Sequence, residues 1–525
     1  MRDFHLPGRS PVWAENGVCA TSSPIAAEAA VQVLKDGGNA LDAAIAGAVL
    51  LGVCEPAMCG LGGDCFALIS PAGTEDVVSF NGSGKAAAKA DAQALRDRGL
   101  DSVSESDPLA VTVPGAVDGF FRMNALWGRK GMDEVLRPAI HYFESGVAMA
   151  PRAVHDYMLL DNKLKGAARN HFVPWGRVPQ PGDRLTLPGQ AEVLRRLAKE
   201  GPAAFYEGEV AEDIIATLQA AGGPQEASDL SAHHGMQTDP IHGEYHGMEL
   251  WEHPPNGQGA AAILLANILA RFDIASMDPV GTQRVHIEAE ATRLAYDARN
   301  RFISDPDHMR RLDHLLDPDT ARKLAALIDP KRATARIGAT AGMVHKDTIY
   351  ITVVDRDRMS VSLIYSLFHG FGSGICTDKF GIMLHSRGTG FSLSPGHGNE
   401  MAPGKRPMHT IIPGMLKQDG RVIMPFGVMG GAYQACGHAR FLSNIVDFGM
   451  DPQEAVDAPR AFAEADLLSV ERGYTPEVRQ ELADMGHRVE VPIKAIGGGQ
   501  AIRLHDSGFL EAGSDSRKDG CAIGY

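Results

Sequence analysis

Strand-like patterns lie towards both ends of this 525-residue chain, and a long, mainly helical pattern separates them. β-branched and glycine-punctuated runs occupy the regions before Ala116 and after Thr348. Apolar residues recur at helical spacing from about Ala116 to Asp329. The strands at the two ends must therefore pair across a large separation in sequence. This pattern predicts an α+β fold in one large domain, with the middle third of the chain forming a helical layer.

Two alanine-rich helices are expected near the N-terminus. The segment from Pro24 to Leu51 is interrupted only at Gly37-Gly38, and Asn39 is a suitable N-cap for the second helix. The faces of both helices carry small and apolar residues, so we expect both helices to be buried. Glycine-rich turns are expected much later in the chain, at Gly427–Gly431 and Gly497–Gly499.

Charge and cysteine content narrow the class of partner. The formal net charge of −15, without a run of Lys and Arg, argues against nucleic acid or an anionic membrane as a partner. The seven cysteines form no CxxC pair, and the scattered histidines show no metal-ligand spacing. The N-terminal residues lack the apolar core of a signal peptide, and the most apolar run, 43–53, is too short to cross a bilayer. We therefore expect a cytoplasmic protein that acts on a small molecule without a metal or cofactor, and the sequence leaves both a monomer and a homo-oligomer open.

Thr348 stands at the start of the clearest hairpin pattern. Apolar and β-branched residues dominate 349–354, a charged turn follows at 355–359, and 361–367 alternates as a returning strand. The preceding segment, from Arg332 to Asp347, has small residues and weak periodicity, which predicts an exposed connection.

A threonine in this position can be a nucleophile if a base lies beside it. Cleavage between Asp347 and Thr348 would free the threonine's own α-amine, whose pKa of about 8 leaves a useful neutral fraction at neutral pH. From spacing alone, a threonine that merely begins a strand is the more common case.

Acyl transfer also needs donors for an oxyanion. Gly430-Gly431 follows the apolar run 421–428, and two successive glycine amides can form an anion-binding concavity, although an ordinary glycine turn has the same pattern. The earlier "GLGGD", 60–64, resembles part of a phosphate loop but lacks the downstream Gly-Lys-Ser/Thr, so we expect no nucleotide site. No GxSxG elbow is present.

Taken together, the motifs resemble the γ-glutamyltransferase family over nearly the whole chain. They occur in family order: "VLKDGGNALDAAIA", "CGLGGDCFALI", "TVPGAVDGFF", "GPAAFYEGEVAEDI", "EHPPNGQG", "AEATRLAYDARNRFISDPD", "DTIYITVVD", "FGSGI", "PGKRPMHTIIP", "MGGAY", "DAPRAF" and "GSDSRKDGCAIGY". The resemblance implies a four-layer αββα N-terminal-nucleophile hydrolase fold. It also implies a precursor that cuts itself into a large chain, 1–347, and a small chain, 348–525, which together form one domain.

The resemblance also assigns roles to individual residues. It implies that Thr348 is the nucleophile and, through its α-amine, the base. Gly430 and Gly431 would supply the oxyanion amides, and Ser366 occupies the position of a hydroxyl residue that assists the nucleophile.

The positions that read a glutamyl group in the family are mostly changed. The family's acidic residue, which grips the α-amino group, falls on Gly390. Other substrate-binding positions, for an asparagine, a glutamine, an arginine and two serines, fall respectively on Phe368, Arg387, Asn81, His409 and Thr410. Removing hydrogen-bond partners for a charged head group should remove the preference for that group. We expect Arg387 and His409 to serve as replacement anchors, although a solvated Arg387 is an equal alternative.

These observations predict an autoprocessing threonine amidohydrolase that acts on a small amide with an anionic acyl group, oxamate-like or glutaryl-type. A true γ-glutamyltransferase or glutathione hydrolase with rearranged contacts is the alternative within the same class. An uncleaved, non-catalytic binding protein is the alternative from another class.

Overall fold

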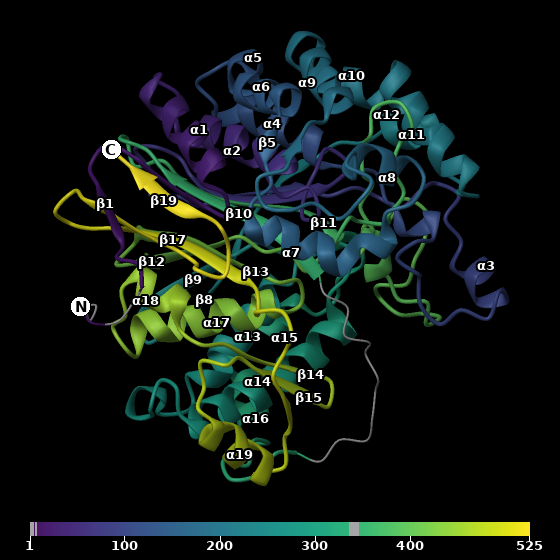
Figure 1. Cartoon of the computed structure of the whole chain (residues 1–525). Helices are drawn as coiled ribbons and strands as arrows, with labels where there is room; N and C mark the ends of the chain where they lie inside the picture. Colours follow the sequence, from purple (N-terminus) through teal and green to yellow (C-terminus); the bar gives the residue numbers. More distant parts are fainter. Residues whose placement is uncertain (1–4, 6–7, 335–345) are drawn as a thin grey trace.

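Two large β-sheets lie face to face at the centre of the structure (Figure 1). The computed structural model describes residue 5, residues 8–334 and residues 346–525. One sheet has the order β1 (Val12–Ala14), β18 (Leu510–Ser514), β17 (Gly498–Leu504), β13 (Arg421–Met429), β12 (Gly414–Gln418), β9 (Met248–Glu252), β8 (Ile241–Tyr245). The other has the order β19 (Cys521–Gly524), β2 (Val18–Thr21), β10 (Lys346–Val354), β11 (Ser360–His369), β3 (Asp64–Ser70), β4 (Val78–Gly82), β7 (Met236–Thr238). Strands from the two ends of the sequence pair with each other in both sheets, as β1 does with β18, β2 with β10 and β3 with β11. This confirms the predicted non-local pairing.

Helices cover the outer face of each sheet, so the fold has four layers (Figure 1). The layer over β10 and β11 is built around α1 (Pro24–Lys35), α2 (Ala40–Cys54), α4 (Ala116–Trp127), α6 (Arg137–Ser145) and α9 (Pro188–Glu200). The layer over β8, β9, β13, β17 and β18 contains α13 (Gly259–Leu269), α14 (Thr282–Phe302), α17 (Tyr433–Val446) and α18 (Pro452–Asp457). The predicted α+β, αββα class is confirmed.

Shorter elements complete the described chain. The helices are α3 (Ala92–Asp97), α5 (Met132–Val135), α7 (Pro151–Leu160), α8 (Ala167–Phe172), α10 (Ala203–Tyr206), α11 (Gly208–Ala220), α12 (Ala227–Ser231), α15 (Leu312–Leu316), α16 (Pro318–Ala325) and α19 (Pro476–Asp484). A small sheet joins β14 (Ala461–Glu464), β15 (Leu467–Val470) and β16 (Arg488–Glu490), and β5 (Val147–Ala148) pairs with β6 (Arg184–Leu185). No helix in these described ranges is long and apolar enough to cross a membrane.

The two predicted N-terminal helices form, but only α2 is buried throughout, as expected; α1 leaves Glu28, Gln32 and Lys35 exposed. The Asn39 side chain accepts hydrogen bonds from the amides of Leu41 and Asp42, and the Asp42 carboxylate accepts one from the Asn39 amide. This reciprocal capping box satisfies amides that the first turn of α2 leaves unpaired. Every residue of α2 is buried, which matches its uniformly small and apolar composition.

The sequence pattern predicted a helical layer for the middle third of the chain. This segment is mainly helical, but it also contains strands. It contains β7 and the hairpin of β8 and β9, which forms the edge of one sheet. His246 and Gly247 both have positive φ, 51° and 82°, as a two-residue hairpin turn requires. The strands are too short for their period-2 alternation to stand out between longer helical segments.

The glycine-rich segments also lie partly inside strands rather than wholly in turns. Gly427 belongs to β13, and Gly498 and Gly499 belong to β17. A Cβ atom on Gly427 would lie 2.3 Å from the Tyr350 ring of the facing sheet. Glycine is therefore needed there because the two sheets approach closely, not because the chain turns.

The hairpin that begins near Thr348 is present, and its turn is the predicted one. The Asp355 side chain accepts hydrogen bonds from the amides of Asp357 and Met359 at the turn between β10 and β11. The predicted exposed connection lies largely outside the described residues, which resume at 346.

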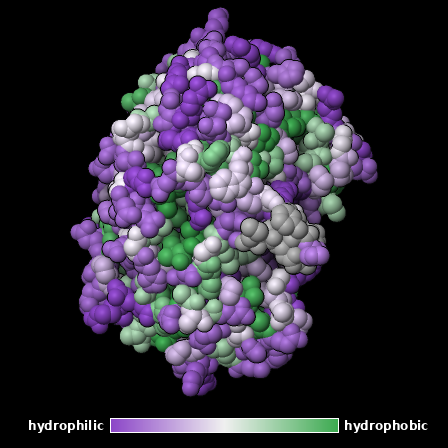
Figure 2. Space-filling view, turned by 90° about the vertical axis from the view of Figure 1, so that its left-hand side faces the viewer, coloured by the Kyte–Doolittle hydropathy of each residue, from purple (hydrophilic) through white to green (hydrophobic). Residues whose placement is uncertain are grey.

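The face of the molecule in Figure 2 is mostly hydrophilic, with hydrophobic residues gathered near its middle.

The inner faces of the two sheets meet in a small apolar cluster. It contains five buried residues: Phe66, Tyr350, Ile364, Ile411 and Met429. These residues come from both sheets and from the segment before β12. Their chain neighbours Asp64, Thr348, Ser366, Thr410 and Gly430 therefore lie at the margin of the space between the sheets.

Candidate active site

Thr348 and Ser366 meet where the pairing of β10 with β11 is interrupted. The register between the two strands shifts between Asp347 and Ile349, which is a β-bulge around Thr348. Thr348 and Ser366 are both buried, and their hydroxyl oxygens lie 3.3 Å apart. The Ser366 hydroxyl also accepts a hydrogen bond of 2.8 Å from the amide of Phe368. Bulges often aim a side chain next to an active site, and this one brings two hydroxyl groups together.

Asp64 is a member of this group that the sequence analysis did not find. It pairs with Ser366 in the ladder of β3 and β11, and directly opposed side chains lie on the same face of a sheet, about 5 Å apart. Its Oδ1 accepts a hydrogen bond of 3.0 Å from the Gly115 amide, and its Oδ2 lies 3.1 Å from Nε2 of His409. The sequence signal was the "GLGGD" motif, which we considered as part of a phosphate loop and as part of a family motif, without assigning a role to Asp64.

Arg387 is completely buried beside these residues, so the solvated alternative is wrong. Its guanidinium carbon lies 4.1 Å from the centre of the Phe368 ring, and its Nη1 lies 3.5 Å from the hydroxyl of Thr410. Its Nε and Nη2 atoms have no hydrogen-bond partner within the described residues. Two donors of a buried cation are therefore available to a ligand.

The charge states of this group are interdependent. Burial lowers the pKa of Arg387 to about 9, against the opposing effect of the Asp64 carboxylate, so the guanidinium is charged at neutral pH. Burial, reinforced by the Arg387 charge, lowers the pKa of His409 to about 3, and burial also lowers that of His385. Burial alone would raise the pKa of Asp64, but the hydrogen bond from His409 and the charge of Arg387 hold it below its ordinary value. Because both histidines are then neutral, Arg387 is the cation that balances the Asp64 charge.

The positions at which the family grips an α-amino group carry no acidic side chain. Phe368 has a φ of 77°, which is strained for a residue with a bulky side chain, and its ring lies against Arg387. At Gly390 a Cβ atom would lie 2.5 Å from the Met408 carbonyl oxygen, so no side chain fits without movement of the backbone. None of these family positions therefore supplies a carboxylate for an ammonium group, and one of them, Arg387, supplies a guanidinium.

Gly430 and Gly431 lie between β13 and the N-terminus of α17. Their φ values are 117° and 60°, and neither amide donates a hydrogen bond within the described part of the chain. The side chain of Gln258 donates to the carbonyl of Gly431 at 3.1 Å and to that of Thr410 at 2.7 Å. The Gln258 side chain therefore links the glycine turn to the segment that carries His409. Two unpaired amides at a helix N-terminus can receive an oxyanion.

Asn81 supports the site but has little left to offer a ligand. Its amide nitrogen donates to the Asn256 side chain at 2.8 Å, and its side-chain oxygen accepts from both the amide and the hydroxyl of Ser83. Asn256 in turn donates to the Pro407 carbonyl at 2.7 Å and accepts the His409 amide on its own carbonyl at 2.7 Å. Asn81 therefore helps to position His409.

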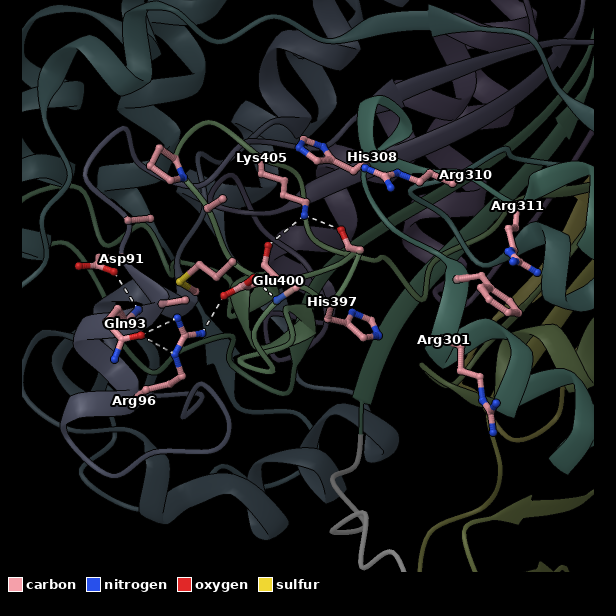
Figure 3. A pocket seen from close by; sticks show the side chains of 18 residues that line it. Asp91, Gln93, Arg96, Arg301, His308, Arg310, Arg311, His397, Glu400 and Lys405 are labelled. Atoms are coloured by element: carbon pink, nitrogen blue, oxygen red, sulfur yellow. Dashed lines mark hydrogen bonds and ion pairs between the residues drawn. The ribbon is translucent and has the colours of Figure 1, made fainter.

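A cavity of about 630 Å³ lies along residues 396–405, in the segment that precedes His409 (Figure 3). Two acidic residues, Asp91 and Glu400, line this basic cavity together with five arginine and lysine residues: Arg96, Arg301, Arg310, Arg311 and Lys405. Arg96 pairs with Glu400 at 2.8 Å, and Lys405 donates to backbone carbonyls of its own segment. Within the described residues, no group of three or more His, Cys, Asp or Glu side chains could hold a metal ion.

Comparison with known proteins identifies the family. The Gamma-glutamyltranspeptidase family model matches residues 26–525. The chain is 34% identical to the Glutathione hydrolase-like YwrD proenzyme of Bacillus subtilis, with 95% of this chain and 97% of the relative covered. It is 33% identical to the oxamate amidohydrolase proenzyme of Klebsiella pneumoniae, with 97% and 98% covered. The crystal structure of a cephalosporin acylase from Bacillus halodurans matches with a TM-score of 0.92 and 34% identity, covering 100% of this chain and 99% of the other. The chain therefore belongs to the γ-glutamyltranspeptidase family and is an enzyme of the N-terminal-nucleophile hydrolase class.

Proposed function

We propose that this enzyme is an autoprocessing threonine amidohydrolase whose nucleophile is Thr348. Cleavage before Thr348 would produce a large chain, 1–347, and a small chain, 348–525. In the uncut chain the Thr348 hydroxyl would attack the carbonyl carbon of Asp347. The peptide C–N bond would break as the C–O bond forms, and water would then hydrolyse the resulting ester. The buried contact between Thr348 and Ser366 supports this proposal, as do the relatives named as proenzymes.

The new N-terminus supplies the base for turnover. The α-amine of Thr348 accepts the hydroxyl proton while Oγ1 bonds to the substrate carbonyl carbon, and the amides of Gly430 and Gly431 receive the oxyanion. The amide C–N bond then breaks, and the amine leaves with the transferred proton. Water attacks the acyl-enzyme, the carboxylic acid leaves, and Thr348 recovers its hydroxyl proton.

The buried Arg387 is the single observation that carries the substrate class. Its two unpartnered nitrogens are suited to a carboxylate, which accepts two parallel hydrogen bonds from a guanidinium. We therefore propose a small amide whose acyl part bears an anion, of the oxamate-like or glutaryl type. The basic cavity in Figure 3 supports this class, because positive potential on a protein attracts anionic substrates. One relative is named an oxamate amidohydrolase.

A γ-glutamyltransferase or glutathione hydrolase is the second candidate, because one relative is named a glutathione hydrolase-like proenzyme. The absence of an acidic side chain at Gly390 favours the first candidate. Since the family is one of enzymes, the non-catalytic alternative has no support from the comparisons.

The first test is the denatured mass of the purified protein together with N-terminal sequencing of each chain. We expect two chains, one of which begins at Thr348, and an uncut chain from Thr348→Ala. A single wild-type chain that stays intact on long incubation would contradict the nucleophile. Hydrolysis of glutaryl and γ-glutamyl anilides by the processed enzyme then separates the two candidates. Faster turnover of the γ-glutamyl compound would favour the glutathione hydrolase.

A further inference from the structure

His409 and Arg387 carry buried polar atoms of opposite kind that lack partners. Nδ1 of His409 and the Nε and Nη2 atoms of Arg387 are buried and form no hydrogen bond within the described residues. More than nine-tenths of buried polar groups in folded proteins are hydrogen-bonded, so such atoms require an explanation. Nη1 of Arg387 lies 3.5 Å from the hydroxyl of Thr410, the residue after His409, so the two side chains lie close together. Their two donors and one acceptor are complementary to a ligand that offers an anion and a hydrogen-bond donor.

The hydrogen bond to Asp64 determines which His409 nitrogen is the acceptor. A carboxylate can only accept, so Nε2 must carry the proton and donate to Oδ2 of Asp64 across 3.1 Å. The remaining ring nitrogen, Nδ1, then presents a lone pair. The centre of the His409 ring lies 4.8 Å from the centre of the Phe66 ring, and the His409 backbone amide donates a hydrogen bond to the Asn256 carbonyl. Both the ring and the backbone of His409 are therefore held in place.

We propose that Asp64 and His409 form a hydrogen-bond acceptor subsite beside Arg387, and that the preferred acyl group therefore carries a neutral hydroxyl or N–H donor next to its carboxylate. This inference rests on the proposed function and refines its substrate class. Arg387 holds the carboxylate, and Nδ1 of His409 accepts the hydrogen bond from the neighbouring donor. An ammonium group is also a donor, but it costs more to bury than a neutral hydroxyl, and Gly390 offers no side-chain carboxylate to contact it.

Three substrates that differ at one carbon test the proposal. Glutaryl, 2-hydroxyglutaryl and γ-glutamyl anilides carry hydrogen, hydroxyl and ammonium, respectively, on the carbon next to the free carboxylate. We expect the wild-type kcat/KM for the hydroxyl compound to exceed that for the glutaryl compound about tenfold or more, because only the former satisfies the buried acceptor. We expect the ammonium compound to fall below the hydroxyl compound. Equal kcat/KM values for the glutaryl and hydroxyl compounds would overturn the inference.

Asp64→Asn supplies a sharper test, because it should reverse the histidine tautomer. Oδ1 of residue 64 is held by the Gly115 amide, so the new amide nitrogen would occupy the Oδ2 position and donate to Nε2 of His409. The ring proton would then move to Nδ1, which becomes a donor. We expect the tenfold preference for the hydroxyl compound to disappear or reverse. A purely structural role for Asp64 would lower kcat/KM for both compounds alike and preserve their ratio, which would contradict the proposal.

His409→Phe is the matched control. It keeps an aromatic ring against Phe66 but removes the acceptor, so the ratio should fall to about one. Thermal midpoints show whether Asp64→Asn and His409→Phe fold. If neither variant folds, the comparison of the three anilides with the wild-type enzyme tests the proposal on its own. Hydrolysis of none of the three anilides by a processed wild-type enzyme would contradict the proposed substrate class, and this inference with it. Hydrolysis without the hydroxyl preference would contradict the inference alone.

Discussion

Replacing Arg387 with methionine should remove most of the preference for an anionic acyl group. Methionine retains an unbranched side chain against Phe368 but has no charge and no donor. Two nitrogens of Arg387 are unpartnered, and a hydrogen bond to a charged group contributes about 1.5–3 kcal/mol. Two such bonds correspond to about 3–6 kcal/mol, which is about a hundredfold to ten-thousandfold in kcat/KM at about 1.4 kcal/mol per tenfold. The loss of kcat/KM should not exceed the upper end of this range, because Arg387→Met also removes the cost of burying a cation, which offsets part of the loss.

The assay compares glutaryl anilide with pentanoyl anilide, which has the same chain length but no carboxylate. The informative quantity is the ratio of the two kcat/KM values, because loss of folding or of the nucleophile lowers both together. We expect Arg387→Met to lower the glutaryl-to-pentanoyl ratio by at least a hundredfold. Arg387→Lys is the matched control and should give an intermediate ratio, since it keeps the charge but not the planar fork. An unchanged ratio in Arg387→Met would refute the assignment of Arg387 to the carboxylate.

Three further outcomes follow from the same geometry. Ser366→Ala removes the acceptor of the Phe368 amide and the hydroxyl beside Thr348, so we expect autoprocessing to slow about tenfold to a hundredfold in an electrophoretic time course; an unchanged rate would exclude a role for that hydroxyl. The pKa of His409 is about 3 in the fold and about 6.5 in an unfolded chain, so the unfolded state binds more protons between these values and stability falls as pH drops from about 6.5 towards 3. At pH 5 this loss is about 2 kcal/mol; thermal midpoints should therefore decline less steeply with acid in His409→Phe, and parallel profiles would contradict the shift. Arg310→Glu should lower kcat/KM for glutaryl anilide at low salt but much less at 0.5 M salt, whereas a salt-independent loss would argue against steering by the basic cavity.

The parts of the fold that were predictable are those with strong local patterns. The hairpin after Thr348 alternates over many residues, and the break at Gly37-Gly38 separates two alanine-rich helices. The hairpin of β8 and β9 was missed because each strand has only five residues and helices flank the pair. Gly427 could not be assigned to a strand, because its role depends on how closely the opposite sheet approaches.

Local sequence patterns likewise predicted some residues of the candidate site and not others. Thr348 and the pair Gly430-Gly431 stand out because nucleophile and oxyanion donors each leave a local mark. Asp64 and His409 are 345 residues apart, and nothing in either segment indicates that their side chains meet. The burial of Arg387 was likewise open, since an arginine in a glycine-containing loop is usually solvated. Only the folded arrangement shows that one carboxylate serves both residues.

The shared role of Asp64 makes a final prediction about stability. A fully buried arginine needs a counter-charge. The Asp64 carboxylate acts on Arg387 through its charge, which raises the pKa of Arg387, and not through an ion pair in direct contact within the described residues, while its oxygens hold Gly115 and His409. Asp64→Asn would leave the Arg387 cation uncompensated, and Arg387→Met would leave the Asp64 anion uncompensated, so each single change should destabilise the fold. Changing both removes both charges, and the double variant should be about 1–3 kcal/mol more stable than the sum of the single effects implies. Thermal midpoints of the four proteins measure this coupling. Additivity within about 0.5 kcal/mol would show that the two charges do not depend on each other, and would remove the reason for an arginine to be buried at this position.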